Sequence, residues 1–471
     1  MISNSNYNIS ADVLQKISSD QAFHYRIVPV QNTEKGMVLK TDSEALQNLL
    51  SELKIVLNTN IILEKCSKED LQKLLTFNYR KSNNKEVSRL NYSDDFLEKI
   101  LIDAQHMGSS DIHFEPYEKR CRVRFRIDGK LIEQFIIPID KYPTMVNKVK
   151  IKADLDIAEK RLPQDGRISI NTNGNEFDIR VSTLPILNGE KLVLRILSKD
   201  STIIDLMRLG FSEQELKTYR EGLKKPSGII LISGPTGSGK TTTLYATLKE
   251  LNKEEDNILT LEDPIEYTLD GINQVQLKEN IGLDFVKTLK TFLRQDPNII
   301  MIGEIRDAET ANIAIRAAQT GHLVLSTIHT NSAWGTISRL IDMGVPSFLI
   351  ASTLNMSLAQ RLVRKLCSTC KVKSEIEPSI FPSDFKIPLD LKFHYEAVGC
   401  NACHHTGYLG REAVYEILPI NQNLRIPIRE NHLEIDNILN ESNILTLKEN
   451  AIKLIMNGIT SIEEAYPLLT S

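Results

Sequence analysis

The sequence has no uninterrupted apolar run of about 18 residues, so no membrane-spanning helix is expected. Residues 1–14 are rich in Ser and Asn and contain no basic segment followed by an apolar core, so a secretory signal peptide is not expected either. Aromatic residues make up only 6% of the chain and the net charge is −4, which does not favour nucleic acid or an anionic membrane as a direct partner. We therefore expect a cytoplasmic protein.

Cysteine is also scarce, and four of the six cysteines form two Cys-x-x-Cys pairs. The predicted metal ligands are Cys367, Cys370, Cys400 and Cys403. Four thiolates from two such pairs make a closed tetrahedral Zn²⁺ site, although the segment 371–399 between them is longer than the usual spacing of about 15–20 residues. His404 and His405 are alternative ligands. Unligated cysteines or a redox pair are the other interpretations.

The 471 residues are too many for one core and suggest about three domains. We predict a small α/β domain over 1–80, a polar linker over 81–95, a second domain over 96–200 and a third over 205–471, with a cysteine-rich insertion at 367–403. Within the first domain, alternating and short apolar runs predict strands at 23–30, 37–40 and 55–57 and helices at 43–53 and 67–75. No catalytic cluster is found there, which favours a docking or packing role.

The segment 234–241 has the pattern G-x-x-x-x-G-K-T. An apolar run at 227–233 predicts a buried strand before it, and leucines at helical spacing predict a helix over 241–251. In that context the glycine loop cradles a triphosphate with backbone N–H groups, Lys240 reaches the β- and γ-phosphates, and the Thr241 hydroxyl holds Mg²⁺. The predicted nucleotide-binding residues are Gly234, Pro235, Thr236, Gly237, Ser238, Gly239, Lys240, Thr241 and Thr242. An ordinary glycine-rich turn is the alternative.

Acidic residues and histidines accompany two further predicted strands that would end in the ligand crevice. Glu262 and Asp263 follow the strand at 257–261, and Glu304 follows the strand at 298–302, where a carboxylate manages Mg²⁺ or the attacking water. His322 and His329 bracket a third strand at 323–327. Structural histidines and sensors of the γ-phosphate are both open interpretations of this pair.

Several arginines of the second predicted domain lie on strands or loops. Residues 120–127 alternate arginine with apolar residues, which predicts a strand with a solvated or salt-bridged face. The arginines that suit contact with an anion are Arg161, Arg167, Arg180 and Arg195. P-loop ATPases commonly add an arginine to the nucleotide pocket, so these residues are candidates to act within the chain or on a neighbouring chain. Structural ion pairs are the equally open alternative.

Taken together, these motifs resemble those of the motor ATPases of type II secretion and type IV pilus assembly, the hexameric secretion superfamily. The resemblance covers roughly residues 95–420 and includes 110–116, 161–167, 234–242, 260–267, 303–307, 321–331 and the four cysteines. It implies an α/β fold class: a RecA-like P-loop ATPase domain, a PAS-like α/β second domain, a small extra N-terminal α/β domain and a zinc-knuckle insertion. Residues 1–90 resemble the family's docking domain only loosely.

The resemblance implies a homo-hexameric ring that hydrolyses ATP with Mg²⁺ and drives assembly of a pseudopilus or pilus. It implies that Glu304 is the catalytic base and that Arg161, Arg167, Arg180 and Arg195 serve the nucleotide pocket. The implied partners are an inner-membrane platform protein and a bitopic adaptor, which would hold the cytoplasmic motor at the inner membrane. The cysteine knuckle points to the secretion and assembly branch rather than to retraction motors.

Three other functions stay open at this point. The alternatives are a type IV pilus extension ATPase, a DNA-translocating or competence-type RecA-like ATPase, and a scaffold that binds ATP without hydrolysing it. The composition argues against the DNA motor, because basic and aromatic stacking segments are missing. The presence of Lys240, Glu262 and Glu304 argues against the scaffold.

Overall fold

The computed structural model describes residues 13, 16–17, 21–22, 25–33, 36–57, 59–68, 70–71, 74–75, 96–172, 175–197, 205–377, 380–381, 385–388, 391–432 and 444–470. The linker predicted over 81–95 lies outside the described residues. None of the described helices has the length and apolar character that crossing a membrane requires.

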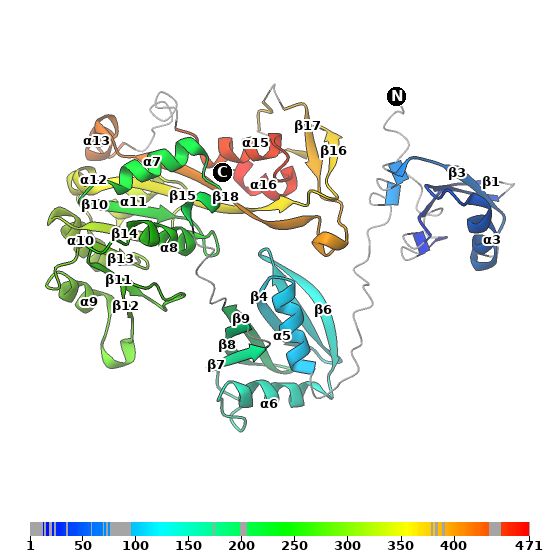
Figure 1. The fold of residues 1–471 in the computed structure, drawn as a ribbon, viewed down its shortest axis with the longest axis horizontal. Coiled ribbons are helices and arrows are strands. Elements are labelled where there is room, and N and C mark those ends of the chain that lie inside the picture. Colours follow the sequence, from blue (N-terminus) through cyan, green and yellow to red (C-terminus); the bar gives the residue numbers. More distant parts are fainter. Residues whose placement is uncertain are drawn as a thin grey trace. The chain divides into compact units, whose positions relative to one another are not determined.

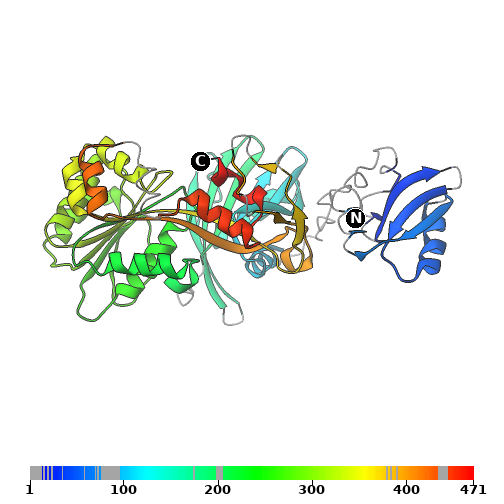
Figure 2. The same cartoon turned by 90° about the horizontal axis from the view of Figure 1, so that it is seen from above.

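A three-stranded sheet with one helix occupies residues 27–65 (Figures 1 and 2). β1 (Ile27–Thr33) pairs antiparallel with β2 (Gly36–Thr41), and β2 pairs parallel with β3 (Ile61–Lys65). A parallel pair needs a crossover connection, and α3 (Leu46–Leu57) provides it. The predicted strand at 55–57 is therefore wrong, because these residues end α3 and the strand comes later, at β3.

Residues 109–197 contribute a six-stranded sheet in the order β6-β5-β4-β9-β8-β7. Its strands are β4 (Ser109–Pro116), β5 (Arg120–Ile127), β6 (Lys130–Pro138), β7 (Gln164–Thr172), β8 (Asn175–Ile186) and β9 (Gly189–Leu197). α5 (Phe96–His106) precedes the sheet and α6 (Tyr142–Lys152) lies between β6 and β7 in the chain. β9 pairs antiparallel with both β4 and β8, so strands distant in the sequence meet at the middle of the sheet.

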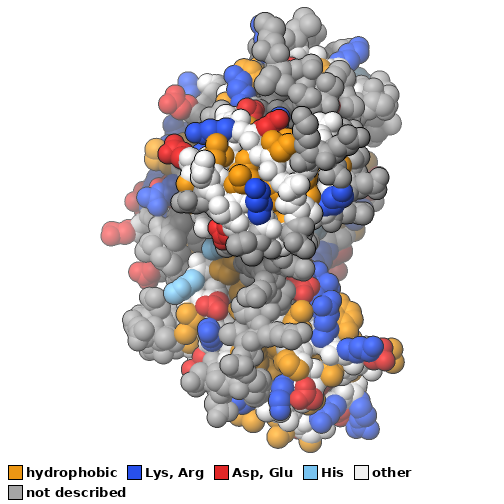
Figure 3. Space-filling model, turned by 90° about the vertical axis from the view of Figure 1, so that its right-hand side faces the viewer, with side chains coloured by type: hydrophobic (Ala, Val, Ile, Leu, Met, Phe, Trp, Pro, Cys, Tyr) orange, Lys and Arg blue, Asp and Glu red, His pale blue; other side chains and the backbone are white. Residues whose placement is uncertain are grey.

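The arginine-rich face predicted for β5 is present. The buried residues of this strand are Cys121, Val123, Phe125 and Ile127. Between them, Arg124 lies 2.7 Å from Glu115 and Arg126 lies 3.2 Å from Asp111, whereas Arg122 donates to the Tyr117 hydroxyl at 2.8 Å. Among the described residues coloured in Figure 3, lysine and arginine are interspersed with acidic and hydrophobic side chains rather than gathered in one patch. The ion-paired interpretation of this face is confirmed for Arg124.

The third sheet has seven strands in the order β12-β11-β13-β14-β10-β15-β18 (Figure 1). Its strands are β10 (Gly228–Ser233), β11 (Ile258–Glu262), β12 (Asn273–Gln276), β13 (Ile299–Ile302), β14 (Leu323–Ile328), β15 (Leu354–Leu366) and β18 (Tyr408–Pro419). All neighbouring strands are parallel except β15 and β18, which are antiparallel. The strands predicted at 227–233, 257–261, 298–302 and 323–327 are confirmed within a few residues.

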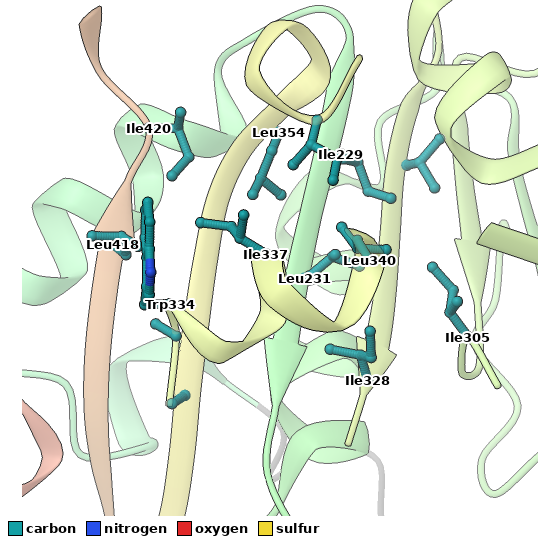
Figure 4. Close-up of a cluster of buried hydrophobic side chains, with 14 of the residues drawn as sticks. Ile229, Leu231, Ile305, Ile328, Trp334, Ile337, Leu340, Leu354, Leu418 and Ile420 are labelled. Carbon is teal, nitrogen blue, oxygen red and sulfur yellow. The ribbon is translucent and has the colours of Figure 1, made fainter. Parts of the chain in front are cut away.

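Helices cover both faces of this sheet because its strands are apolar on both sides. The helices are α7 (Glu213–Leu223), α8 (Lys240–Leu251), α9 (Phe285–Phe292), α10 (Ala308–Gln319), α11 (Gly335–Asp342), α12 (Ser347–Thr353), α13 (Gln422–Arg429), α15 (Leu447–Met456) and α16 (Ile462–Leu469). Ile229 and Leu231 of β10 join the cluster drawn in Figure 4, with Ile337 and Leu340 of α11. The alternate β10 residues, with Ile230 among them, join a second cluster that includes α7 and α8.

β15 and β18 are longer than the other strands of the sheet and form an arm that extends beyond β10 (Figures 1 and 2). β10 pairs only with residues 354–359 of β15, whereas the pairing with β18 continues to Leu366. Short strands β16 (Val372–Glu375) and β17 (Phe393–Glu396) follow β15 and pair with each other. The arm thus carries the cysteine-containing segment at its far end.

Candidate functional site

The sheet order places the phosphate loop beside the predicted acidic residues. β13 and β14 lie between β11 and β10, and all four strands are parallel. Their carboxyl ends therefore meet at one edge of the sheet, which is where open α/β sheets bind ligands. The segments that follow these four ends contain Lys240, Asp263, Glu304 and His329.

The loop after β10 has the backbone that phosphate binding requires. Gly234 and Gly239 adopt φ of 148° and 88°, and a Cβ built at Gly234 would lie 2.5 Å from the Gln360 carbonyl oxygen. Only glycine fits both positions without strain. Gly239 caps the N-terminus of α8, whose free N–H groups attract anions.

Two side chains of this loop point to an anionic ligand. Lys240 is 8% exposed and its Nζ donates to the carbonyl oxygens of Gly234 and Pro235 at 2.8 and 3.0 Å. The pKa of the Lys240 ammonium is lowered, chiefly by burial, and the nearby Glu304 carboxylate offsets part of this shift. The Ser238 hydroxyl is buried and has no hydrogen-bond partner among the described residues. A triphosphate would supply acceptors to both groups.

Glu304 lies two residues after β13, between two side chains that carry or can carry positive charge. Arg306 forms an ion pair with its Oε1, and the His329 Nε2 lies 3.3 Å from its Oε2. The hydrogen bond with Glu304 raises the pKa of Arg306. The Glu304 side chain is 21% exposed, so it remains accessible to the solvent in the cleft.

These groups line one cleft with a volume of about 790 Å³, which lies in the size range of small-molecule sites. Predicted residues that line it are Thr236, Gly237, Ser238, Gly239, Lys240, Thr241, Thr242, Glu262, Asp263, Glu304 and His329. Residues that the sequence reasoning missed are Tyr267, Phe285, Arg306, Leu362 and Arg411. Arg306 lies two residues after Glu304 in the same sequence motif, so it could have been found from the sequence. Leu362 and Arg411, in contrast, reach the cleft only through β15 and β18.

His322 is not brought to this cleft. It precedes β14 and therefore lies at the opposite end of that strand from His329. Its Nδ1 lies 2.9 Å from the Ala317 carbonyl oxygen and 3.2 Å from the Thr320 hydroxyl, at the end of α10. The two histidines that bracket the strand are thus separated by its length, and only His329 is close to Glu304.

The four predicted arginines do not line the cleft either. Three of them pair with carboxylates of their own sheet or loop: Arg161 with Glu159, Arg167 with Asp178 and Arg195 with Asp111. Arg180 donates to the Ile265 carbonyl oxygen at 3.1 Å and lies 3.7 Å from Glu266. The side chains of Arg161, Arg167 and Arg195 remain 89%, 65% and 59% exposed.

The four cysteines of the arm form one cluster. The Sγ atoms of Cys367, Cys370, Cys400 and Cys403 all lie within 4.8 Å of one another. Three of the Sγ–Sγ distances are 3.8 Å. A tetrahedral zinc with Zn–S bonds of about 2.3 Å requires Sγ–Sγ distances of about 3.8 Å. The sulfurs also accept backbone N–H groups, for example from Gly407 to Cys403 at 3.2 Å. The donor set fits Zn²⁺, and neither His404 nor His405 belongs to this cluster of described residues.

Comparison with known proteins finds close relatives of this chain. The family model described as "Type II/IV secretion system protein" matches residues 88–466. A type IV pilus assembly ATPase PilB from Myxococcus xanthus is 48% identical over 78% of this chain and 66% of its own length. A type II secretion system protein E from Pseudomonas aeruginosa is 46% identical over 78% of this chain and 74% of its own length. The chain therefore spans slightly less than two thirds of the Myxococcus protein.

Solved structures resemble the fold as well. The ATPase DotB from Legionella pneumophila gives a TM-score of 0.60 at 20% identity, covering 80% of this chain and 96% of that chain. The pilus retraction motor PilT, solved with bound ADP, gives a TM-score of 0.53 at 26% identity, covering 78% and 95%. These similarities confirm the predicted RecA-like α/β fold class.

Proposed function

Because the chain belongs to the family of type II/IV secretion system proteins, we propose that it is an ATP-hydrolysing motor that drives assembly of a pseudopilus in type II protein secretion. The relatives named as type II secretion proteins and those named as pilus assembly ATPases have nearly equal identity to this chain. A type IV pilus extension ATPase is therefore the alternative within the family.

One observation carries the proposal: Lys240 of the phosphate loop and Glu304 line the same cleft at the edge of the sheet. Phosphoryl transfer to water needs mainly positioning and neutralised charge. Lys240 and the N–H groups at the start of α8 hold the phosphates. Glu304 orients the attacking water and accepts its proton, while ATP and water become ADP and inorganic phosphate.

Two groups near Glu304 have supporting roles in this proposal. Arg306, which pairs with Glu304, is free to turn toward the negative charge of the γ-phosphate. His329, whose Nε2 lies 3.3 Å from the Glu304 carboxylate, acts as the sensor of the γ-phosphate. Mg²⁺ would be held by the Thr241 hydroxyl and Asp263, both exposed in the cleft, and it would neutralise charge on the phosphates.

The assembly, the partners and the domain boundaries are part of the same proposal. A homo-hexamer would place exposed arginines such as Arg161 of one chain near the nucleotide of the next. The domains run over 1–80, 96–200 and 205–471, and the first docks to an inner-membrane platform protein and a bitopic adaptor. The motor would then work in the cytoplasm at the inner membrane. Zn²⁺ on the four cysteines of the arm would hold the ends of β15 and β18 together.

Turnover of purified full-length protein tests the hydrolytic mechanism. Glu304→Gln should lower the ATP hydrolysis rate by about 10²- to 10⁴-fold while fluorescent ATP analogues still bind. Glu309→Gln is the matched control, because Glu309 is an exposed glutamate on the neighbouring α10 and should leave the rate unchanged. Undiminished turnover in Glu304→Gln would refute the proposed mechanism.

Stimulation of turnover separates the secretion motor from a nucleic-acid motor. We expect the rate to rise when the cytoplasmic segment of an inner-membrane platform protein is added. A rise with single-stranded DNA, and none with the platform segment, would favour the DNA-translocating alternative.

A further inference from the structure

The Tyr245 hydroxyl connects the phosphate-loop helix to a wall of the cleft. Tyr245 lies in the second turn of α8, which begins at Lys240. Its Oη donates to Glu262 and accepts the backbone N–H groups of Glu266 and Tyr267, at 3.2 and 3.5 Å. One hydroxyl therefore ties α8 to the end of β11 and to residues 266–267, which line the cleft.

Glu262 is the centre of this connection. It is 3% exposed, and each of its carboxylate oxygens accepts hydrogen bonds. Oε1 accepts from the Thr260 hydroxyl at 2.6 Å and from the Gln274 amide at 3.1 Å, while Oε2 accepts from Tyr245. Gln274 also donates to the Tyr267 carbonyl oxygen at 2.9 Å. Donors from α8, β11 and β12 thus converge on one buried carboxylate.

The protonation of the tyrosine fixes the direction of its bond. Burial and the adjacent Glu262 carboxylate both raise the pKa of Tyr245, so its hydroxyl keeps the proton that it donates. The Tyr245 and Tyr267 rings meet edge to face with centroids 5.6 Å apart, which packs the same segment against α8.

We propose that Tyr245 and Glu262 are positioning residues for ATP hydrolysis, which hold residues 263–267 in place against the phosphate-loop helix. This proposal rests on the proposed function. It assigns Glu262 a role different from the metal and water chemistry expected of it from its sequence position, because its oxygens are already engaged by neutral donors. Asp263, the next residue, is exposed and lines the cleft, so it is the acid of this pair that faces the ligand.

The chain offers a matched control for the loss of a tyrosine hydroxyl. Tyr219 of α7 is also buried, and its Oη lies 2.6 Å from the Thr247 hydroxyl of the same helix α8. It makes no contribution to the lining of the cleft among the described residues. Tyr219→Phe and Tyr245→Phe therefore each remove one buried hydroxyl that joins α8 to another part of the fold, but only the second releases residues 266–267.

Hydrogen exchange tests the connection without any need for turnover. In the full-length protein, Tyr245→Phe should raise amide exchange of the peptide that covers residues 263–269 by about fivefold, the equivalent of one lost hydrogen bond. Tyr219→Phe should leave exchange of that peptide unchanged. Equal exchange in wild type and Tyr245→Phe would overturn the proposal, whether or not the protein hydrolyses ATP.

Steady-state kinetics, measured well below the melting temperature of each variant, tests the positioning role. Tyr245→Phe should lower kcat by about tenfold and change KM for ATP less than about twofold, because Lys240 and the phosphate loop are untouched. Tyr219→Phe should leave both constants unchanged. A wild-type protein without ATPase activity would refute the proposed function instead. The exchange experiment would still test whether Tyr245 holds residues 266–267 in place.

Glu262→Gln separates positioning from metal binding. If Glu262 is a positioning residue, Glu262→Gln should leave the half-saturating Mg²⁺ concentration unchanged. The Tyr245→Phe/Glu262→Gln double variant should then be no slower than the slower single variant, since both substitutions break the same connection. If Glu262→Gln raises the Mg²⁺ requirement and costs as much turnover as Glu304→Gln, Glu262 contacts the reacting groups and the positioning proposal is wrong.

Discussion

Removal of one cysteine of the arm should release zinc and loosen the end of the β15–β18 pair. Sγ–Sγ distances of 3.8 Å fit four thiolates on one tetrahedral ion and are far longer than the 2.0 Å or so of a disulfide. Cys367 follows directly after β15 and Cys403 lies five residues before β18, so the ion would fasten the strands where they leave the sheet. Cys400→Ser removes one ligand and leaves the backbone unchanged.

The expected loss of stability follows from the length of the loop that the bound ion closes. A cross-link from Cys370 to Cys400 closes a loop of about 30 residues, and the loss of chain entropy in the unfolded state then stabilises the fold by about 3.5 kcal/mol. For a domain of the size of residues 205–471, that change lowers the melting temperature by about 10 °C. Chelation of the wild-type protein should lower it by a similar amount.

The assay combines metal content with calorimetry. We expect about one zinc per wild-type chain by elemental analysis and a sharply reduced zinc content in Cys400→Ser. Cys66→Ser is the control, because Cys66 is a free thiol outside the cluster and its loss should leave the zinc content unchanged. A full equivalent of zinc in Cys400→Ser, or wild-type protein that binds no zinc when it is supplied, would contradict the assignment.

Two further predictions concern stability. The Arg364 guanidinium makes two hydrogen bonds to Glu464, at 3.0 and 2.6 Å, and the two side chains are only 16% and 14% exposed. Arg364→Met should therefore destabilise the protein by about 3 kcal/mol in urea unfolding, and Arg364→Met/Glu464→Met should recover part of the loss. A double variant as unstable as the single one would contradict this. Burial, with the charges of Arg126 and Lys191, lowers the pKa of His113, so the unfolded chain takes up the proton first as the pH falls. The contribution of His113 to stability should be complete above about pH 6.5 and decline below it by at most about 1.4 kcal/mol per pH unit. His113→Phe should reduce the slope measured in urea titrations over about pH 5 to 8 by up to this amount, while His394, whose pKa burial also lowers, keeps part of it.

The sequence predicted the parts of the cleft that depend on local pattern. The phosphate loop was recognisable because a buried strand and a helix start flank it, and Glu304 was recognisable because it follows a continuous apolar run. Both signals come from within a dozen residues. Short apolar runs are less informative, and the predicted strand at 55–57 was wrong because Ile55 to Leu57 continue the apolar pattern of α3.

The rest of the cleft depends on the register between strands, which no local pattern contains. Leu362 and Arg411 reach the cleft because β15 pairs with both β10 and β18. The direction of β14 likewise decides that His329, and not His322, lies beside Glu304. The burial of Glu262 could not be predicted either, because its hydrogen-bond donors come from α8 and β12 as well as from its own strand.

Glu262 ends β11 and Glu304 follows the neighbouring strand β13, but the two carboxylates are held by different interactions. The partners of Glu262 are neutral, and two of them, Tyr245 and Thr260, are buried. Any rearrangement would leave polar groups without hydrogen bonds in the interior, which is costly. Glu304 is held by Arg306, whose side chain is 59% exposed, and such an ion pair costs little to exchange for an anionic ligand. Rearrangement on ATP binding should therefore occur at Glu304 and Arg306, while Glu262 and Tyr245 keep residues 263–267 fixed.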